Sequence, residues 1–343
     1  MLTFKLNNEP TNIQQTICYA RKISDFPVAQ IIFKLVTCNI STKNNMGKYK
    51  TINVDYPEYK IYIKNLEKLK KYNFNDYSPD EIYHKYHDLA LILPSLGAKL
   101  VFKEINGYVL YRARLSRTIG KNEDLSLIQS FSFPPPSVCK NKQRANINYK
   151  SVFYCADEAF PAIKECGAID GEEGYLSIWK INANRDLNYA SCLPEKLPHK
   201  NRWVEYGAFH HTFLRENQTL ENKSLLNHKI ALRNLITDKF MKEKAPYHLS
   251  SMLANEYPYY QNNDLLLYPS VQTFQEYTNF AIHPNAALKQ LECFKIYKFK
   301  LVEQGKEQVK LNFLSIGDIE NDRIKWRNPT NSDGEELGFS KID

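Results

Sequence analysis

The chain has few glycines, no glycine-rich phosphate loop and no long apolar run, and each shortage excludes a class of protein. Only 12 of its 343 residues are glycine. No stretch matches G-x-G-x-x-G or the P-loop pattern, which excludes a nucleotide site of either kind. No uncharged apolar run approaches the roughly 20 residues of a membrane-spanning helix, so no membrane association is predicted. The first ten residues have neither an apolar stretch nor a small-residue cleavage site, so no signal peptide is predicted either.

Paired cysteine motifs are also missing. None of the seven cysteines forms C-x-x-C, and no histidine spacing completes a zinc site. The cysteines are Cys18, Cys38, Cys139, Cys155, Cys166, Cys192 and Cys293. An odd, scattered set is typical of reduced thiols in a cytosol, so we predict a cytoplasmic protein without a metal site.

Positive charge is present in moderate excess. Lysine and arginine number 46 against 38 aspartates and glutamates, which gives a formal net charge of +8. This excess suits a polyanion, a phosphate-bearing small ligand or an ordinary solvated surface. No helix-turn-helix, zinc-finger or aromatic RNA-binding motif accompanies it, so nucleic acid is not an expected partner.

Residues 1–98 are predicted to form a mainly helical N-terminal module. Apolar side chains recur at helical spacing over 59–69, which predicts an amphipathic helix with a lysine-rich outer face. A second helix is predicted to begin at Ser78, because Ser78 and Glu81 have the spacing of a capping box.

Residues 99–343 are predicted to form the main domain, of the α+β class. Asn106-Gly107 between two apolar runs predicts a β-hairpin near the start of this domain. The other expected elements are a strand, helix and strand through 181, a polar irregular insertion at 183–222, helices over 223–243 and 246–256, an apolar strand at 265–271, and a C-terminal hairpin at 291–316 around Gln304-Gly305-Lys306.

Three short motifs carry side chains suited to phosphate and ribose chemistry. The first is Tyr-Arg-Ala-Arg at 111–114. In the second, at 143–165, an Arg-x-Asn turn precedes a short apolar strand and a helix-like run that carries a glutamate. The third is Tyr-Pro-Ser at 268–270, followed by Asn279. Guanidinium groups bind phosphate through paired hydrogen bonds, and a fixed carboxylate stabilises positive charge.

With these motifs in this order, the chain resembles the RES domain over roughly residues 108–285. RES proteins are bacterial NAD-degrading toxins built like ADP-ribosyltransferases. The resemblance implies an α+β fold with an ADP-ribosyltransferase-like, split, mostly antiparallel sheet and flanking helices, and an NAD+ cleft between the two halves of the sheet. It implies an NAD+ glycohydrolase that acts as a bacterial toxin or anti-phage defence effector, with NAD+ as substrate and no cofactor.

The resemblance assigns Arg112, Glu165 and Ser270 as the catalytic residues. Arg112 would hold the pyrophosphate, and Glu165 would stabilise the positive charge that develops on the ribose as the nicotinamide–ribose bond breaks. Ser270 would hydrogen-bond the nicotinamide amide or the ribose. The substrate-binding residues are expected to be Arg144, Tyr154, Tyr111, Asn146 and Asn279.

Each central residue also has an ordinary structural interpretation. Arg112 could be a surface ion-pair partner, and Glu165 a solvated residue on a helix face. Ser270 could satisfy its own turn, and Tyr154 could belong to the core. The resemblance favours the functional interpretation of all four.

Three histidines are interpreted as structural or solvated. His210 and His211 would point to opposite faces of a strand, and no third metal ligand is spaced near them. His248 near Tyr247 is treated in the same way.

Two other functions compete with NAD+ hydrolysis. The same site could transfer ADP-ribose to a macromolecule, because only the acceptor differs. The chain could instead be a non-enzymatic basic module that binds nucleic acid or protein, favoured by its lysine-rich N-terminal face. For the enzyme, the expected partners are an antitoxin or regulatory protein and a homo-oligomer, and residues 1–98 are hypothesised to inhibit the site in cis or to recruit such a partner.

Overall fold

The computed structural model describes most of the chain. The described residues are 3–6, 41–43, 49–51, 56–72, 78, 81, 84, 97–208, 223–256, 258, 262–306, 308–335 and 339–341.

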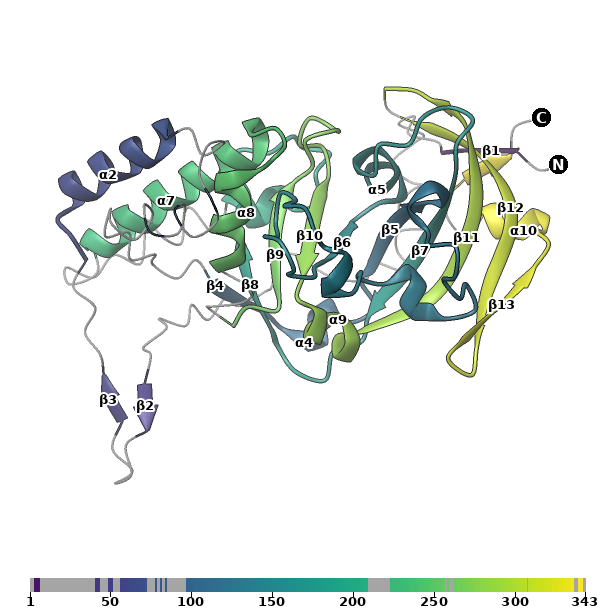
Figure 1. Cartoon of the computed structure of the whole chain (residues 1–343), viewed down its shortest axis with the longest axis horizontal. Helices are drawn as coiled ribbons and strands as arrows, with labels where there is room; N and C mark the ends of the chain where they lie inside the picture. Colours follow the sequence, from purple (N-terminus) through teal and green to yellow (C-terminus); the bar gives the residue numbers. More distant parts are fainter. Residues whose placement is uncertain are drawn as a thin grey trace.

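A twelve-stranded sheet runs through the molecule (Figure 1). Its strands are β1 (Thr3–Leu6), β4 (Gly97–Leu100), β5 (Val109–Leu115), β6 (Phe153–Ala156), β7 (Glu173–Ile181), β8 (Leu187–Ser191), β9 (Leu265–Pro269), β10 (Thr278–Ile282), β11 (Leu291–Gln304), β12 (Val309–Glu320), β13 (Arg323–Arg327) and β14 (Phe339–Lys341). The order is β14-β1-β12-β11-β7-β5-β6-β10-β9-β8-β4, with β13 paired to β12. Among the described strands, β8 and β9 alone pair in parallel. Strands β2 (Ser41–Lys43) and β3 (Tyr49–Thr51) pair separately.

The sheet narrows to a single paired position between β5 and β6. Tyr111 opposite Ala156 is the one residue pair that joins these strands. Away from this point β5 pairs along its whole length with β7, and β6 pairs along its whole length with β10. The sheet therefore consists of two halves. Strands β5 and β6, which carry parts of the first and second sequence motifs, line the junction between them.

Helices flank the sheet (Figure 1). At one end α2 (Tyr59–Lys71), α7 (Lys223–Lys242) and α8 (His248–Asn255) lie together beside β9. Helix α5 (Ala159–Glu165) packs against β5 and β6. Short helices among the described residues include α4 (Phe102–Ile105), α9 (Pro284–Gln290) and α10 (Asn331–Glu335), with 3-10 turns at Ser116–Thr118, Ile128–Phe131 and Pro136–Val138. The protein is thus a mixed α+β protein with a large, mostly antiparallel sheet and flanking helices.

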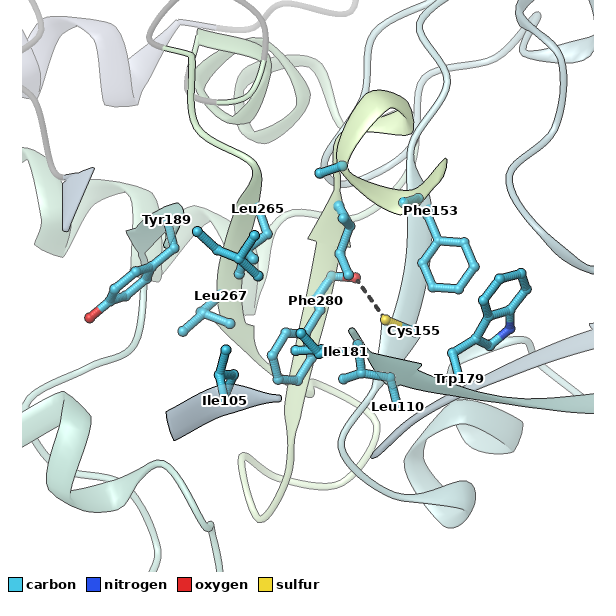
Figure 2. Close-up of a cluster of buried hydrophobic side chains, with 14 of the residues drawn as sticks. Ile105, Leu110, Phe153, Cys155, Trp179, Ile181, Tyr189, Leu265, Leu267 and Phe280 are labelled. Atoms are coloured by element: carbon cyan, nitrogen blue, oxygen red, sulfur yellow. Dashed lines mark hydrogen bonds between the residues drawn. The ribbon is translucent and has the colours of Figure 1, made fainter. Parts of the chain in front are cut away.

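The two faces of the sheet have separate cores because side chains alternate along each strand. On one face, Phe153 and Cys155 of β6 pack with Trp179 and Phe280 (Figure 2). On the other face, Tyr154 packs under α7 and α8, and Ala156 packs under α5. Since Glu165 ends α5, this second face is the one that concerns the predicted site.

Several predicted elements are confirmed. Helix α2 buries Tyr62, Leu66 and Leu69 of the predicted stripe. Helices α7 and α8 and strand β9 occupy the predicted segments, and β11 and β12 pair antiparallel on either side of Gly305. The predicted capping box is also present, because the backbone amide of Ser78 donates to the carboxylate of Glu81 and the Glu81 amide donates back to the serine hydroxyl. The rest of that predicted helix lies outside the described residues.

Two predictions are wrong. The hairpin at Asn106-Gly107 is not formed, because the residues before it make α4 and β4 pairs with β8 instead of β5. The turn itself remains, with Gly107 at a φ of 85°. The segment 183–222, expected to be irregular, contributes β8 to the sheet. A five-residue strand buried on both sides has no alternation that could have revealed it.

Candidate functional site

Helix α5 brings Glu165 to the sheet face. Ala159, Phe160, Ala162 and Ile163 bury one side of this short helix against the sheet. The helix ends after Glu165, where Gly167 adopts a φ of 69° that suits a helix C-terminus. Glu165 is therefore the last helical residue, and its side chain is exposed.

One carboxylate oxygen of Glu165 collects four hydrogen-bond donors. Its Oε1 accepts from Ser270 Oγ at 2.6 Å and from Asn279 Nδ2 at 2.9 Å. The backbone amides of Val271 and Gln272 also donate to it, at 3.1 and 3.4 Å. No donor from the described residues reaches Oε2. The carboxylate is thus held by one oxygen and presents the other.

Strands β9 and β10 supply these donors. The two strands pair antiparallel, with Tyr268 opposite Asn279. Ser270 follows the last residue of β9 and is fully buried, and its own amide donates to the carbonyl of Tyr277 at 2.8 Å. Alternation places Tyr268, Ser270 and Asn279 on the face that carries α5, which is why they can meet Glu165.

The Arg-x-Asn turn is attached to β6 through Tyr154. The Tyr154 hydroxyl donates to Asn146 Oδ1 at 2.8 Å and accepts from the backbone amide of Ala145 at 2.9 Å. Asn146 is buried. Two predicted substrate-binding residues therefore form one rigid unit beside the junction of the half-sheets.

Arg112 is a partly buried cation with unused hydrogen-bonding capacity. Its Nη1 donates to the carbonyl of Tyr154 at 3.0 Å, and its guanidinium lies 5.6 Å from the Phe153 ring centre. Its Nε is sealed from solvent and has no partner. No carboxylate of the described residues pairs with it, whereas Arg114 two residues on is bound to Glu123. Burial, and secondly the charge of Arg114, lower the pKa of Arg112 to about 10.

Arg144 is occupied elsewhere. Its Nη1 donates to the carbonyls of Phe240 and Glu243 at the end of α7, and its guanidinium stacks 4.7 Å from the ring centre of Tyr247. A cation at this position satisfies carbonyls that a helix C-terminus leaves free. Arg144 therefore caps α7, and its guanidinium makes no hydrogen bond to Glu165, Ser270 or Asn279, which together are called the Glu165 group.

Tyr111 and Tyr268 also lie on the face of the sheet that carries α5. Tyr111, at the single β5–β6 pairing, is partly buried, and burial raises the pKa of its hydroxyl. Tyr268 is buried, and its pKa is raised first by burial and then by Tyr154 and Glu165, whereas Arg144 opposes the rise. Tyr268 was not predicted as a site residue, although its place in the Tyr-Pro-Ser motif was a signal for it.

Arg112 and Ser270 do not make the contacts that their structural interpretations predict. Arg112 forms no ion pair among the described residues, and Ser270 bonds Glu165 instead of its own turn. Glu165 is exposed, as a solvated helix residue would be, but one of its oxygens is fixed. Tyr154 does pack against the core, while its hydroxyl orders the Arg-x-Asn turn.

The histidines form no site with these residues. Lys142 Nζ lies 2.9 Å from His248 Nδ1, and burial followed by the Lys142 charge lowers the pKa of His248. His210 and His211 lie outside the described residues. Within the described part of the chain, no group of three or more His, Cys, Asp or Glu side chains is arranged to hold a metal ion.

Comparison of the chain with protein-family models, with curated proteins and with solved structures finds no match. Among the described residues, no helix combines the length and apolar character needed to cross a bilayer.

Proposed function

We propose that the protein is an NAD+ glycohydrolase of the RES kind, with an ADP-ribosyltransferase-like arrangement of its split sheet. The observation that carries the proposal is the meeting of Glu165, Ser270 and Asn279 at one carboxylate oxygen. These residues were selected from sequence motifs, and Glu165 lies 105 and 114 positions from the other two. Ordinary turn or surface roles do not require them to meet.

Glu165 is suited to the chemistry of N-glycosidic cleavage. As the bond between nicotinamide and ribose breaks, positive charge develops on the ribose ring and the nicotinamide leaves as a neutral base. A carboxylate fixed through Oε1 presents Oε2 to stabilise that charge without reorganising. Water then adds to the ribose carbon and releases a proton, which gives ADP-ribose and nicotinamide. Ser270 and Asn279 act through Glu165 by holding it.

Arg112 is suited to the pyrophosphate. The resemblance assigns the pyrophosphate to Arg112, whose planar guanidinium can bind phosphate oxygens in pairs and whose Nη1 donates to the carbonyl of Tyr154. Tyr154 and Tyr111 flank the junction between the half-sheets, where aromatic rings could contact the nicotinamide. Arg144 and Asn146 have a supporting role in this scheme, because they order the end of α7 and the Tyr154 hydroxyl.

The biological role follows from the resemblance. An enzyme that depletes NAD+ would serve as a bacterial toxin or anti-phage defence effector in the cytoplasm, restrained by an antitoxin, a regulatory protein or self-assembly. Helix α2 packs on α7 and joins its core cluster, so this helix of the N-terminal segment is attached to the helices beside β9, and the hypothesis that the segment inhibits the site in cis is tested by deleting residues 1–98.

Transfer of ADP-ribose to a macromolecule is the alternative outcome of the same chemistry. Glu165 is exposed, so an acceptor larger than water could approach the ribose carbon. A third proposal, a non-enzymatic basic module, leaves the Glu165 group without a use.

The proposal is tested by incubating purified protein with NAD+ and separating nicotinamide, ADP-ribose and protein-bound label. We expect free nicotinamide and ADP-ribose from the wild type. Glu165→Gln is expected to lower kcat about 10²–10³-fold, the usual cost of removing one group that stabilises charge in the transition state. Arg112→Lys is expected to raise KM, since lysine keeps the charge but cannot make paired hydrogen bonds.

Two matched controls accompany these variants. Glu303→Gln and Arg323→Lys change exposed residues of the same types, whose side chains contact Lys310 and Ser126 instead of the site. Both should retain wild-type activity. Labelled protein without free ADP-ribose would replace hydrolysis by transfer, and wild-type activity in Glu165→Gln would contradict the site.

A further inference from the structure

Four consecutive residues in the segment between β8 and α7 contact the supports of the Glu165 group. They are residues 200–203, Lys-Asn-Arg-Trp, and are called the clasp. Their partners include Glu158, Glu276 and Thr278, so the clasp meets the sheet where β6 and β9 end and β10 begins. No sequence motif pointed to this segment, and the proposed function gives it no role.

The loop of residues 271–277, between β9 and β10, carries two of the donors to Glu165. Two of its backbone amides donate to the Oε1 atom of that carboxylate. Further along the loop, Phe274 and Gln275 both adopt left-handed φ angles, of 51° and 69°. Residues with a Cβ rarely adopt this conformation, which costs free energy and persists only where surrounding contacts impose it. The contacts that impose it are therefore part of what keeps the two amides in place.

Asn201 supplies such a contact. It is buried, with an exposed fraction of 1%, and its Nδ2 donates to the carbonyl of Gln275 at 2.8 Å. Its Oδ1 accepts from Thr278 Oγ1 at 3.0 Å and from the backbone amide of Trp203 at 2.8 Å. Thr278 is the first residue of β10 and immediately precedes Asn279. One buried side chain thus ties the left-handed part of the loop to the start of the strand that carries Asn279.

The two charged residues of the clasp form ion pairs. Lys200 Nζ lies 3.0 Å from Glu276 Oε2, near the end of the same loop. Arg202 pairs with Glu158, the residue before the first turn of α5, and Glu165 is the last residue of that helix. The clasp therefore contacts both the loop that donates to the carboxylate and the start of the helix that carries it.

Trp203 extends the clasp across the narrow junction of the sheet. Its ring centre lies 5.5 Å from that of Phe280 in β10, and its Nε1 donates to the hydroxyl of Tyr108 at 3.0 Å. Tyr108 directly precedes β5, and its carbonyl accepts from the amide of Ile181 at the end of β7. Since β5 and β6 share a single paired position, Trp203 adds a further connection between the two halves of the sheet.

We propose that the clasp fixes the 271–277 loop, β10 and the start of α5 relative to one another, and that Asn201 is a positioning residue for the backbone donors of Glu165. Its effect on kcat rests on the proposed function, whereas its effect on the hydrogen bonds of Glu165 does not. Part of the segment that the sequence predicted to be an irregular insertion thereby belongs to the candidate site.

The first test is hydrogen exchange at the amides of Val271 and Gln272, which report whether Glu165 is held. In Asn201→Ala their protection factors should fall about tenfold, because the local opening that exposes them no longer has to break the Asn201 hydrogen bonds. The control Asn312→Ala changes a similarly buried asparagine on β12. It should lower protection only for amides of the β7–β11 ladder, which exchange by global unfolding.

The second test separates kcat from KM for nicotinamide release. Asn201→Ala should lower kcat about tenfold and change KM by less than about twofold, because it disturbs a group that acts in the transition state and leaves Arg112 in place. Asn312→Ala should keep both constants within about twofold of the wild type. A residue that only stabilised the fold would not lower kcat of the folded protein.

If Asn201→Ala does not fold, a double variant of exposed residues decides the matter. Lys200→Gln with Arg202→Gln removes both ion pairs of the clasp and should lower the same two protection factors about threefold. The matched control, Lys310→Gln with Lys325→Gln, removes two exposed ion pairs elsewhere and should leave them unchanged.

Protection of Val271 and Gln272 that is unchanged in a folded clasp variant, or that falls equally in clasp and control variants, would overturn the proposal. Absent NAD+ turnover by the wild type, together with the expected changes in protection, would overturn only the proposed function.

Discussion

The hydroxyl of Ser270 provides the sharpest test of how Glu165 is held. Ser270 is fully buried, and its Oγ lies 2.6 Å from Glu165 Oε1. A hydrogen bond to a charged group contributes about 1.5–3 kcal/mol. Because Glu165 is exposed and three other donors remain, we expect the low end, about 1.5 kcal/mol. Ser270→Ala should therefore lower kcat/KM about tenfold, since about 1.4 kcal/mol corresponds to a factor of ten.

The assay is a double-mutant cycle with Glu165→Gln. Initial rates of nicotinamide release are measured for the wild type, both single variants and the double variant, with denaturant unfolding to verify that each is folded. If Ser270 acts by holding the carboxylate, Ser270→Ala should cost less than about twofold once Glu165 is already Gln, a coupling of about 1 kcal/mol. Ser332→Ala, an exposed serine on α10, is the control. Equal losses in both backgrounds would refute the reasoning, because independent residues add.

Two further predictions concern stability and are measured by denaturant unfolding. Arg233 is fully buried and donates through Nε and Nη2 to the carbonyl of Leu193 at 3.0 and 2.6 Å. Arg233→Ala should lower the free energy of unfolding by about 3–5 kcal/mol, because it leaves a cavity and an unpaired carbonyl. A loss under about 1 kcal/mol would contradict this. A Cβ on Gly207 would lie 2.5 Å from the carbonyl oxygen of Pro194, so Gly207→Ala should cost about 1–3 kcal/mol, whereas Gly120→Ala, whose nearest atom is 3.8 Å away, should change stability by less than about 0.5 kcal/mol.

Local patterns were sufficient for several elements of the fold. The apolar stripe of α2, the capping box at Ser78, the length of α7 and the turn at Gly305 are encoded within a few neighbouring residues. The spacing of apolar residues and the residue types that form caps and turns act over such short distances. They can therefore be recognised in the sequence without knowing which elements pack together.

Strand pairing was not encoded in that way. Asn106-Gly107 has the composition of a hairpin turn, yet β4 pairs with β8 and β5 with β7. The choice depends on which strands bury the most apolar surface together, and that is decided by residues distant in sequence.

For the candidate site, the sequence by itself determined which side chains are present and suggested, through motif order, that Arg112, Glu165 and Ser270 belong together. Only the tertiary structure decided that Ser270 and Asn279 hold one oxygen of Glu165 and that Arg144 caps α7. The physical reason is that hydrogen bonds and burial depend on positions in space. A buried donor or acceptor must find a partner wherever the folded chain provides one, and here the partners lie about a hundred residues away.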